Sequence, residues 1–276
     1  MQGGVETHSE YLYTRLAHLG CDVTLFARAP YVTYRETMHN GVRLIAVECP
    51  KSKHMEALVH TAKAILQARL LKPDILHIQS IGPSIFAPLA RMLGMKVVVT
   101  HHGENYKHKK WGFLARQFLR LCEAVGSLSA HEIIAISEHI SALLEAKYDR
   151  KAAVIPNGVE IPVFLESEDA LEQFGLEKGR YILAVGRLVP EKGFHDLIEA
   201  FERACLIGRK LVIVGRADHE DAYSTNLKEK ASRNPNVVMT GFLKGQPLQE
   251  LYSHAGLFVI PSYYEGLPIV LLEALS

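Results

Sequence analysis

The stretch Tyr181-Ile-Leu-Ala-Val-Gly-Arg-Leu-Val-Pro-Glu-Lys-Gly193 indicates the fold of this chain. Residues 181–185 are apolar without alternation, which is typical of a strand buried on both faces of a parallel sheet. A loop of glycine, proline and charged residues follows, and the amphipathic run 194–206 then predicts a helix. A buried strand, a polar loop and a helix in succession are the repeating unit of an α/β protein.

The same alternation of apolar strands and amphipathic helices runs along the whole chain. This order predicts parallel sheets joined by right-handed crossovers. We expect strands over residues 22–28, 42–47, 74–79, 96–100, 132–136, 152–155, 181–185, 210–214, 236–240 and 256–260. We expect helices over residues 7–19, 55–71, 113–127, 137–147, 194–206, 223–232, 247–253 and 269–275.

The composition excludes several classes of protein. The 276 residues are 48% hydrophobic and 22% charged, which supports a buried core and excludes a disordered chain. A net charge of +1 gives no bulk attraction to nucleic acid. No apolar run is long enough for a membrane span, and no signal peptide is recognisable. Four separated cysteines predict buried thiols in a reducing compartment, so we expect a cytoplasmic α/β protein.

One segment interrupts the alternation. Ile155-Pro-Asn-Gly-Val-Glu-Ile-Pro162 carries two prolines and an Asn-Gly turn signal. We interpret it as the hinge between two α/β domains, residues 1–157 and 158–276. The alternative is a loop within one larger sheet, but about ten strands is many for a single open sheet.

Both ends of the chain indicate missing elements. Gly3 and Gly4 stand directly before the first predicted helix, where a doubly wound domain has its phosphate-facing turn, and such a turn should follow a strand. The apolar run 269–275 stops at Ser276 without a cap or a following element. We therefore expect a fragment that lacks a first strand and some C-terminal elements.

The strongest functional motif is Glu265-Gly-Leu-Pro-Ile-Val-Leu-Leu-Glu273, which follows the last predicted strand. Pro268 suits the first turn of a helix, so Glu265 should lie in the loop before that helix and Glu273 within it. The free N–H groups and the positive dipole of a helix N-terminus can bind phosphate. One glutamate could then reach a sugar hydroxyl and the other a ribose. The alternative is a surface glutamate and an unrelated glutamate on a helix face.

A second motif, Gly186 to Gly193, holds Arg187 and Lys192 at the carboxyl end of the predicted strand 181–185. Ligands of open α/β sheets bind at that end of the strands. An arginine and a lysine across one loop can both turn toward a pyrophosphate, the arginine with a planar fork and the lysine as a point charge. The alternative is two solvated cations beside Glu191.

A third motif, Thr100-His-His-Gly-Glu104, follows another predicted strand. Neighbouring side chains at a strand end point apart, so we expect His101 to pack or cap and His102 to face the cleft between the domains. There His102 could act as a base or as a hydrogen-bond donor to substrate. No cysteine or aspartate lies at a zinc-like spacing, and we expect no metal site.

A small basic and aromatic patch follows this motif. It runs from Tyr106 to Trp111 and continues with Arg116 and Arg120. Such a patch could meet an anionic acceptor or a membrane surface. The alternative is a solvated loop and helix face.

Taken together, these motifs resemble the retaining glycosyltransferases of family 4, which have the GT-B fold. The matching pieces stand in family order at residues 3–8, 100–103, 155–159, 186–193 and 261–273. The resemblance implies two Rossmann-like, doubly wound parallel-sheet domains that face a cleft, an N-terminal acceptor domain and a C-terminal donor domain. It implies transfer of a sugar from a nucleotide diphosphate donor, with retained anomeric configuration and with no required metal or other cofactor.

The resemblance also implies the site residues. His102 would contact the donor sugar, Arg187 and Lys192 would neutralise the leaving pyrophosphate, and Glu265 would face the donor sugar. Glu273 would hold the ribose. The donor-binding residues implied by the resemblance are Gly3, Gly4, Gly266, Leu267 and Glu273.

The implied partners are a UDP- or GDP-type sugar donor and a glycan or lipid-linked glycan acceptor of cell-surface polysaccharide biosynthesis. No nucleic acid is expected, and peripheral contact at the inner face of the cell membrane is compatible with the resemblance. Two other hypotheses stay open. One is a nucleotide-sugar epimerase of the same fold, which would release a free sugar, and the other is a truncated remnant that at most binds nucleotide.

Overall fold

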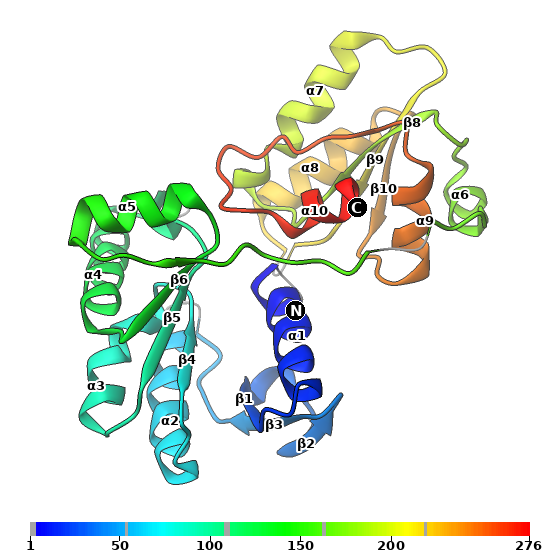
Figure 1. Ribbon diagram of the computed structural model, residues 1–276. Helices are drawn as coiled ribbons and strands as arrows, with labels where there is room; N and C mark the ends of the chain where they lie inside the picture. Colours follow the sequence, from blue (N-terminus) through cyan, green and yellow to red (C-terminus); the bar gives the residue numbers. More distant parts are fainter. Residues whose placement is uncertain (1–3, 53–54, 108–110, 162–163, 218–219) are drawn as a thin grey trace. The chain divides into compact units, whose positions relative to one another are not determined.

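The computed structural model describes residues 4–52, 55–107, 111–161, 164–217 and 220–276 (Figure 1). The chain divides into two compact units, with the boundary after Gly158. Each unit combines parallel strands with helices that cover the sheets, so the α/β class expected from the sequence is confirmed.

The first unit holds two sheets. Strands β1 (Val23–Arg28) and β3 (Val42–Val47) are parallel, and β2 (Glu36–His39) lies antiparallel on β3. The second sheet is parallel throughout. Its order is β4 (Leu76–Gln79), β5 (Val97–His101), β6 (Glu132–Ala135) and β7 (Ala153–Val154). Among the described strands, β1 and β4 therefore each bond to a neighbour on one side only.

The helices of the first unit include two short ones that the sequence analysis did not anticipate, α3 and the turn η2. Helix α4 packs closely on η2 because Gly126 has no side chain, and a Cβ there would overlap the Ser84 hydroxyl. The helices are α1 (Gly4–His18), α2 (Glu56–Leu71), α3 (Ala87–Met92), α4 (Phe113–Ser129) and α5 (Glu138–Tyr148). The 3-10 turns are η1 (Ala29–Tyr31), η2 (Pro83–Phe86) and η3 (Asn105–Lys107).

The second unit holds one parallel sheet of four strands. Its order is β10 (Val237–Gly241), β9 (Lys210–Val214), β8 (Tyr181–Val185) and β11 (Leu257–Phe258). Its helices are α6 (Asp169–Phe174), α7 (Phe194–Ala204), α8 (Ala222–Ser232), α9 (Gln246–His254) and α10 (Ile269–Leu275), with the 3-10 turn η4 (Pro190–Lys192). In the described parts of both units, no helix is long and apolar enough to cross a membrane.

Strand β9 is buried on both faces, as its uninterrupted apolar run predicts. Leu211 and Ile213 pack with α7 and α8 on one face of the sheet. Val212 and Val214 pack with α6 and α9 on the other face. This doubly covered sheet is a rigid support for the loops that leave its carboxyl end.

One local expectation differs from the structure, and one strand was not expected. Gly4 is the first residue of α1 and not part of a turn, because Glu6 in the first helical turn favours a helix that starts earlier than residue 7. Gly3 lies outside the described residues. Strand β2 is an antiparallel edge strand, Glu36 to His39, whose polar residues gave no apolar run to detect.

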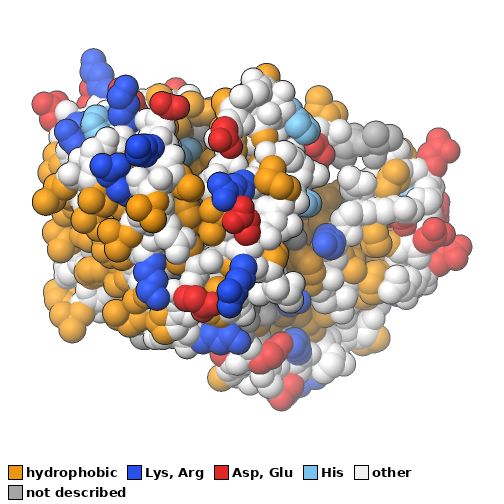
Figure 2. All heavy atoms as spheres, turned by 90° about the horizontal axis from the view of Figure 1, so that it is seen from below, with side chains coloured by type: hydrophobic (Ala, Val, Ile, Leu, Met, Phe, Trp, Pro, Cys, Tyr) orange, Lys and Arg blue, Asp and Glu red, His pale blue; other side chains and the backbone are white. Residues whose placement is uncertain are grey.

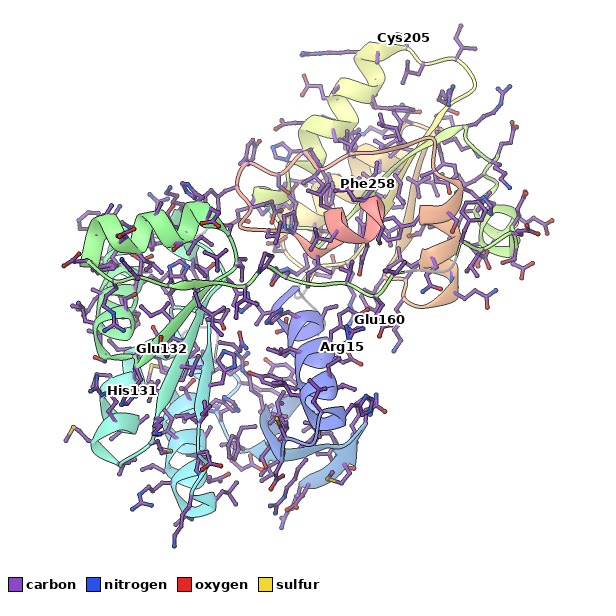
Figure 3. All side chains as sticks on the ribbon, in the orientation of Figure 1. Arg15, His131, Glu132, Glu160, Cys205 and Phe258 are labelled. Atoms are coloured by element: carbon purple, nitrogen blue, oxygen red, sulfur yellow. The ribbon has the colours of Figure 1, made fainter. Side chains whose placement is uncertain are left out.

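The cysteines are not all buried. Cys49 and Cys122 are buried, as expected, but Cys21 and Cys205 are exposed, and all four are free. Cys205 follows the last residue of α7 in the left-handed conformation (φ 47°) and lies at the tip of that helix (Figure 3). Turn residues that follow a helix lie at the surface, so the expectation of four buried thiols was wrong for these two.

Candidate functional site

Loops at the carboxyl end of the second unit's sheet approach one another closely. A Cβ at Gly215, after β9, would overlap the carbonyl oxygen of Gly186, after β8. Gly193, between η4 and α7, has φ +65°, and a Cβ there would overlap the carbonyl oxygen of Pro261. Only glycine allows both approaches. The loop 186–193 is thereby held directly against the segment that follows β11.

Lys192 and Glu265 meet where these two segments touch. Lys192 Nζ donates a hydrogen bond to Glu265 Oε1 at 2.5 Å, and the two side chains are 20% and 25% exposed. The backbone N–H of Tyr263 also donates to the carbonyl of Glu191 at 3.0 Å. The Tyr263 hydroxyl donates to the carboxylate of Asp196 in the first turn of α7. Two contacts therefore join the loop after β8 to the loop before α10, and a third joins that second loop to α7.

The remaining residues of these two motifs lie in the same region of the second unit. Arg187 follows Gly186 directly at the carboxyl end of β8, and its side chain is exposed. Gly266 and Leu267 stand between Glu265 and Pro268, the residue that precedes α10. The structure thus gathers the cationic loop and the glutamate loop around one end of one sheet.

Glu273 lies on α10 and is oriented by a residue that the sequence analysis missed. Tyr252 on α9 donates its hydroxyl to Glu273 Oε2 at 3.0 Å. Burial raises the pKa of Glu273, and the hydrogen bond from Tyr252 opposes that rise. Burial and the neighbouring carboxylate raise the pKa of Tyr252, so the hydroxyl keeps its proton. Tyr252 belongs to no motif, and only its contact with α10 identifies it.

His102 lies in the first unit, just after β5. Its Nε2 is 2.6 Å from Gln79 Oε1 on β4. The ring of His8 on α1 meets the His102 ring edge-on, with centroids 5.1 Å apart. Burial, and then the neighbouring histidines, lower the pKa of His102 to about 3. His102 is therefore a neutral imidazole at physiological pH.

His101 packs within the first unit. Its Nδ1 accepts the backbone N–H of Gly103 at 3.2 Å, so its Nε2–H donates to Glu123 Oε1 at 2.9 Å. Glu123 is fully buried on α4 and also accepts from Tyr148 and Lys147 at 2.8 and 3.1 Å. Burial alone would raise the pKa of Glu123, but these hydrogen bonds bring it down to about 2. This ionised cluster anchors the loop that carries His102.

Several histidines lie near one another in the first unit. His8 and His102 are in ring contact, and the Tyr13 hydroxyl lies between His77 and Gln79, the partner of His102. Within the residues that the structure describes, no group of three or more His, Cys, Asp or Glu side chains is placed to bind a metal ion.

The sequence matches two family models. The model described as Glycosyltransferase Family 4 matches residues 2–161, and the model described as Glycosyl transferases group 1 matches residues 166–276. TuaC of Bacillus subtilis (strain 168), a glycosyltransferase named for teichuronic acid biosynthesis, is 30% identical over 228 residues, which are 78% of this chain and 54% of TuaC. The chain spans about half the length of the curated relatives it matches.

Solved structures share the fold. Sucrose-phosphate synthase from Thermosynechococcus elongatus has a TM-score of 0.83 at 21% identity, covering 99% of this chain and 73% of that one. HepE from Anabaena, solved in complex with UDP-glucose, has a TM-score of 0.78 at 19% identity, covering 99% and 75%. The architecture is therefore the GT-B fold of these proteins. Because the family model covers more than half of its residues, this chain belongs to glycosyltransferase family 4.

Proposed function

We propose that this protein transfers a sugar from a nucleotide diphosphate donor to a glycan or lipid-linked glycan acceptor in cell-surface polysaccharide biosynthesis. The observation that carries the proposal is the ion pair of Lys192 and Glu265. It joins a cationic loop and a glutamate loop at the carboxyl end of a parallel sheet, where α/β proteins bind nucleotides.

Lys192 and Arg187 would stabilise the leaving nucleotide. When the bond between the sugar and the diphosphate breaks, negative charge grows on the phosphate oxygens, and fixed cations lower the energy of that state. Glu265 holds the Lys192 ammonium in a half-buried position, which keeps the cation ready without reorganisation. The other proposed donor contacts are Gly266 and Leu267, which directly follow Glu265, and Gly4 in the first unit.

Glu273 would bind the ribose of the donor. An ionised carboxylate accepts hydrogen bonds from the two vicinal ribose hydroxyls. The hydroxyl of Tyr252 already holds one oxygen of Glu273, so the side chain is oriented before the nucleotide arrives.

We propose that the transfer retains the anomeric configuration. The acceptor oxygen forms its bond to the anomeric carbon on the face from which the diphosphate leaves, and the acceptor proton passes to a phosphate oxygen of the leaving nucleotide. Glu265 is paired with Lys192, so its role here is to orient and not to attack the sugar. The cations supply the charge neutralisation that the step needs, so no metal is required.

Product analysis with defined donors tests the proposal. The protein is incubated with UDP-glucose or GDP-mannose and with lipid-linked or soluble glycan acceptors, and the anomeric configuration of the product is read by NMR. An axial linkage from an axial donor is expected. A free, epimerised sugar formed without acceptor would instead identify an epimerase, and nucleotide binding without turnover would identify a non-catalytic protein.

We also propose that helix α4 contacts the inner face of the cell membrane. Phe113, Leu114 and Leu121 are 73%, 82% and 53% exposed, with Arg120 exposed among them. Figure 2 shows one face of the protein, on which hydrophobic side chains are exposed with Lys and Arg side chains between them. Apolar and basic side chains together suit an anionic bilayer surface. Leu114→Glu should abolish sedimentation with phosphatidylglycerol vesicles, and unchanged sedimentation would exclude this surface.

A further inference from the structure

A chain of hydrogen bonds extends from His102 into the first unit. It links residues from α1, β4 and β5, which are far apart in sequence. His102 Nε2 lies 2.6 Å from Gln79 Oε1, and Gln79 Nε2 lies 2.9 Å from the Tyr13 hydroxyl. The Tyr13 hydroxyl lies 3.2 Å from His77 Nδ1, and His77 Nε2 lies 2.7 Å from Thr100 Oγ1.

The carboxamide of Gln79 gives this chain a direction. A carboxamide oxygen only accepts hydrogen bonds, so His102 Nε2 must carry the proton that it shares with Gln79. The carboxamide nitrogen only donates, so the Tyr13 oxygen accepts from it. The 2.6 Å separation between His102 Nε2 and Gln79 Oε1 is short even for an N–H···O hydrogen bond. If the carboxamide were flipped, its nitrogen would face His102 Nε2 at this distance, which is shorter still for two nitrogen atoms.

The rest of the chain is consistent with this direction. Tyr13 accepts from Gln79, which leaves its hydroxyl proton for His77 Nδ1. His77 Nε2–H then donates to Thr100. The separation of 3.5 Å between Gln79 Nε2 and His77 Nε2 is too long for a strong competing bond.

Burial keeps the three titratable side chains of this hydrogen-bond chain neutral. It lowers the pKa of His77 to about 4, and together with the neighbouring histidines it lowers the pKa of His102 to about 3. Burial also raises the pKa of Tyr13, against the effect of its bond to Gln79. Each imidazole therefore carries one ring proton at neutral pH, and its tautomer decides which nitrogen donates and which accepts.

We propose that Gln79 and Tyr13 are positioning residues that hold His102 in the Nε2–H tautomer. The proposal rests on the proposed function and deepens it. With its proton committed to Gln79, His102 presents the lone pair of Nδ1, to which no group among the described residues bonds. His102 then acts toward the donor sugar as an acceptor for a hydroxyl, and neither as an N–H donor nor as a cation.

The tautomer is measured directly by long-range ¹H–¹⁵N NMR of the histidine rings in the substrate-free protein. We expect about 95% of the His102 rings to carry their proton on Nε2. The exposed His139 in the same spectrum should show the mixture of the two tautomers that a solvated histidine has. Gln79→Met keeps the length of the side chain but removes the acceptor, and should shift the His102 ratio to that of His139. Gln79→Glu keeps an acceptor oxygen and should restore the Nε2–H tautomer.

Tyr13→Phe tests the second positioning residue. Without the hydroxyl, the Gln79 amide loses the acceptor that orients it, so a mixture at His102 is expected. Tyr34→Phe, in the same unit but outside this hydrogen-bond chain, is the matched control and should change nothing. A wild-type His102 in the Nδ1–H form, or one with the same ratio as His139, overturns the proposal. So does a Gln79→Met spectrum identical to that of the wild type.

Kinetics separate this proposal from the proposed function. Gln79→Met and Tyr13→Phe should each lower kcat/KM about tenfold, and Gln79→Glu should recover most of that loss above neutral pH. A wild-type protein with the expected tautomer and no transferase activity would remove the proposed function and leave the tautomer assignment standing. Full activity in Gln79→Met with a mixed tautomer would remove the role of the tautomer in catalysis.

Discussion

Lys192 and Glu265, 73 positions apart in the sequence, form a half-buried ion pair with an N···O distance of 2.5 Å. The pair exists because Gly193 lets the loop after β8 touch the backbone of Pro261. Each charge therefore sets the position of the other, and a change at one residue alters the site at both.

Lys192→Ala should lower kcat/KM for sugar transfer by about 100-fold or more, because a fixed cation at the leaving diphosphate is lost. Steady-state kinetics with the preferred donor measure the effect. The matched control is Lys228→Ala on α8, which breaks an exposed ion pair with Glu220 and should leave transfer unchanged. Thermal unfolding should show that both variants are folded, and full activity in Lys192→Ala would reject the assignment.

Glu273→Gln should weaken donor binding about tenfold because it removes the charge of the side chain. Tyr252→Phe should have a similar effect because it removes the hydroxyl that orients Glu273. Isothermal titration with the nucleotide diphosphate measures this. Because burial raises the pKa of Glu273, wild-type affinity should begin to fall at a higher pH than for an exposed glutamate as the solution is acidified. Glu273→Gln should lack this pH dependence, and a parallel decline in both proteins would contradict the role.

Acid should destabilise the first unit through its buried histidines. The folded pKa of His77 is about 4, below the ordinary 6.5, so unfolding takes up a proton between those values. The free energy of unfolding is therefore expected to fall as the pH drops from about 7 to about 4. Urea titrations at pH 7.5 and pH 5 measure this fall in the free energy of unfolding. The fall should be about 1 to 2 kcal/mol smaller in His77→Gln than in the wild type. Equal losses would show that His77 titrates normally.

Glu123→Ala should cost about 3 to 5 kcal/mol of unfolding free energy, because it leaves His101 and Lys147 facing a buried space without their anion. The control is Glu132→Ala, an exposed glutamate at the start of β6, with an expected change below about 0.5 kcal/mol (Figure 3). Denaturant titrations compare the two. Similar small effects would mean that the polar cluster contributes little to stability.

Chelation should not alter transfer. The proposed step uses Lys192 and Arg187 for charge neutralisation, so activity after treatment with EDTA should remain within about twofold of the untreated protein. Added Mg²⁺ or Mn²⁺ should not restore activity to Lys192→Ala. Loss of transfer on chelation, reversed by one of these ions, would require a metal in the mechanism.

The fold was predictable where one local signal was enough. Strands β8 and β9 coincide with the expected 181–185 and 210–214, because a strand covered on both faces is apolar at every position. Strand β11 is shorter than the expected 256–260, since only Leu257 and Phe258 pair with β8. Helix α6 was missed because it is six residues long and opens with acidic side chains, which gave no clear apolar period.

The site was predictable only where its residues belong to a recognisable sequence motif. Lys192 and Glu265 stand in recognisable loops, so the sequence identified both, although not their direct bond. Gln79, Tyr13 and Tyr252 carry no motif. Their importance arises from contacts across 66, 64 and 21 positions of sequence, which only the folded chain reveals.

The division of the first unit's strands into two sheets has a consequence for handling the protein. In the part of the chain that the structure describes, β1 and β4 each carry a row of backbone groups with no cross-strand partner, and strand edges of this kind template the addition of another chain. Self-association should therefore grow with concentration, and deuterium should replace the outer amide hydrogens of β1 and β4 sooner than those of β5 and β9.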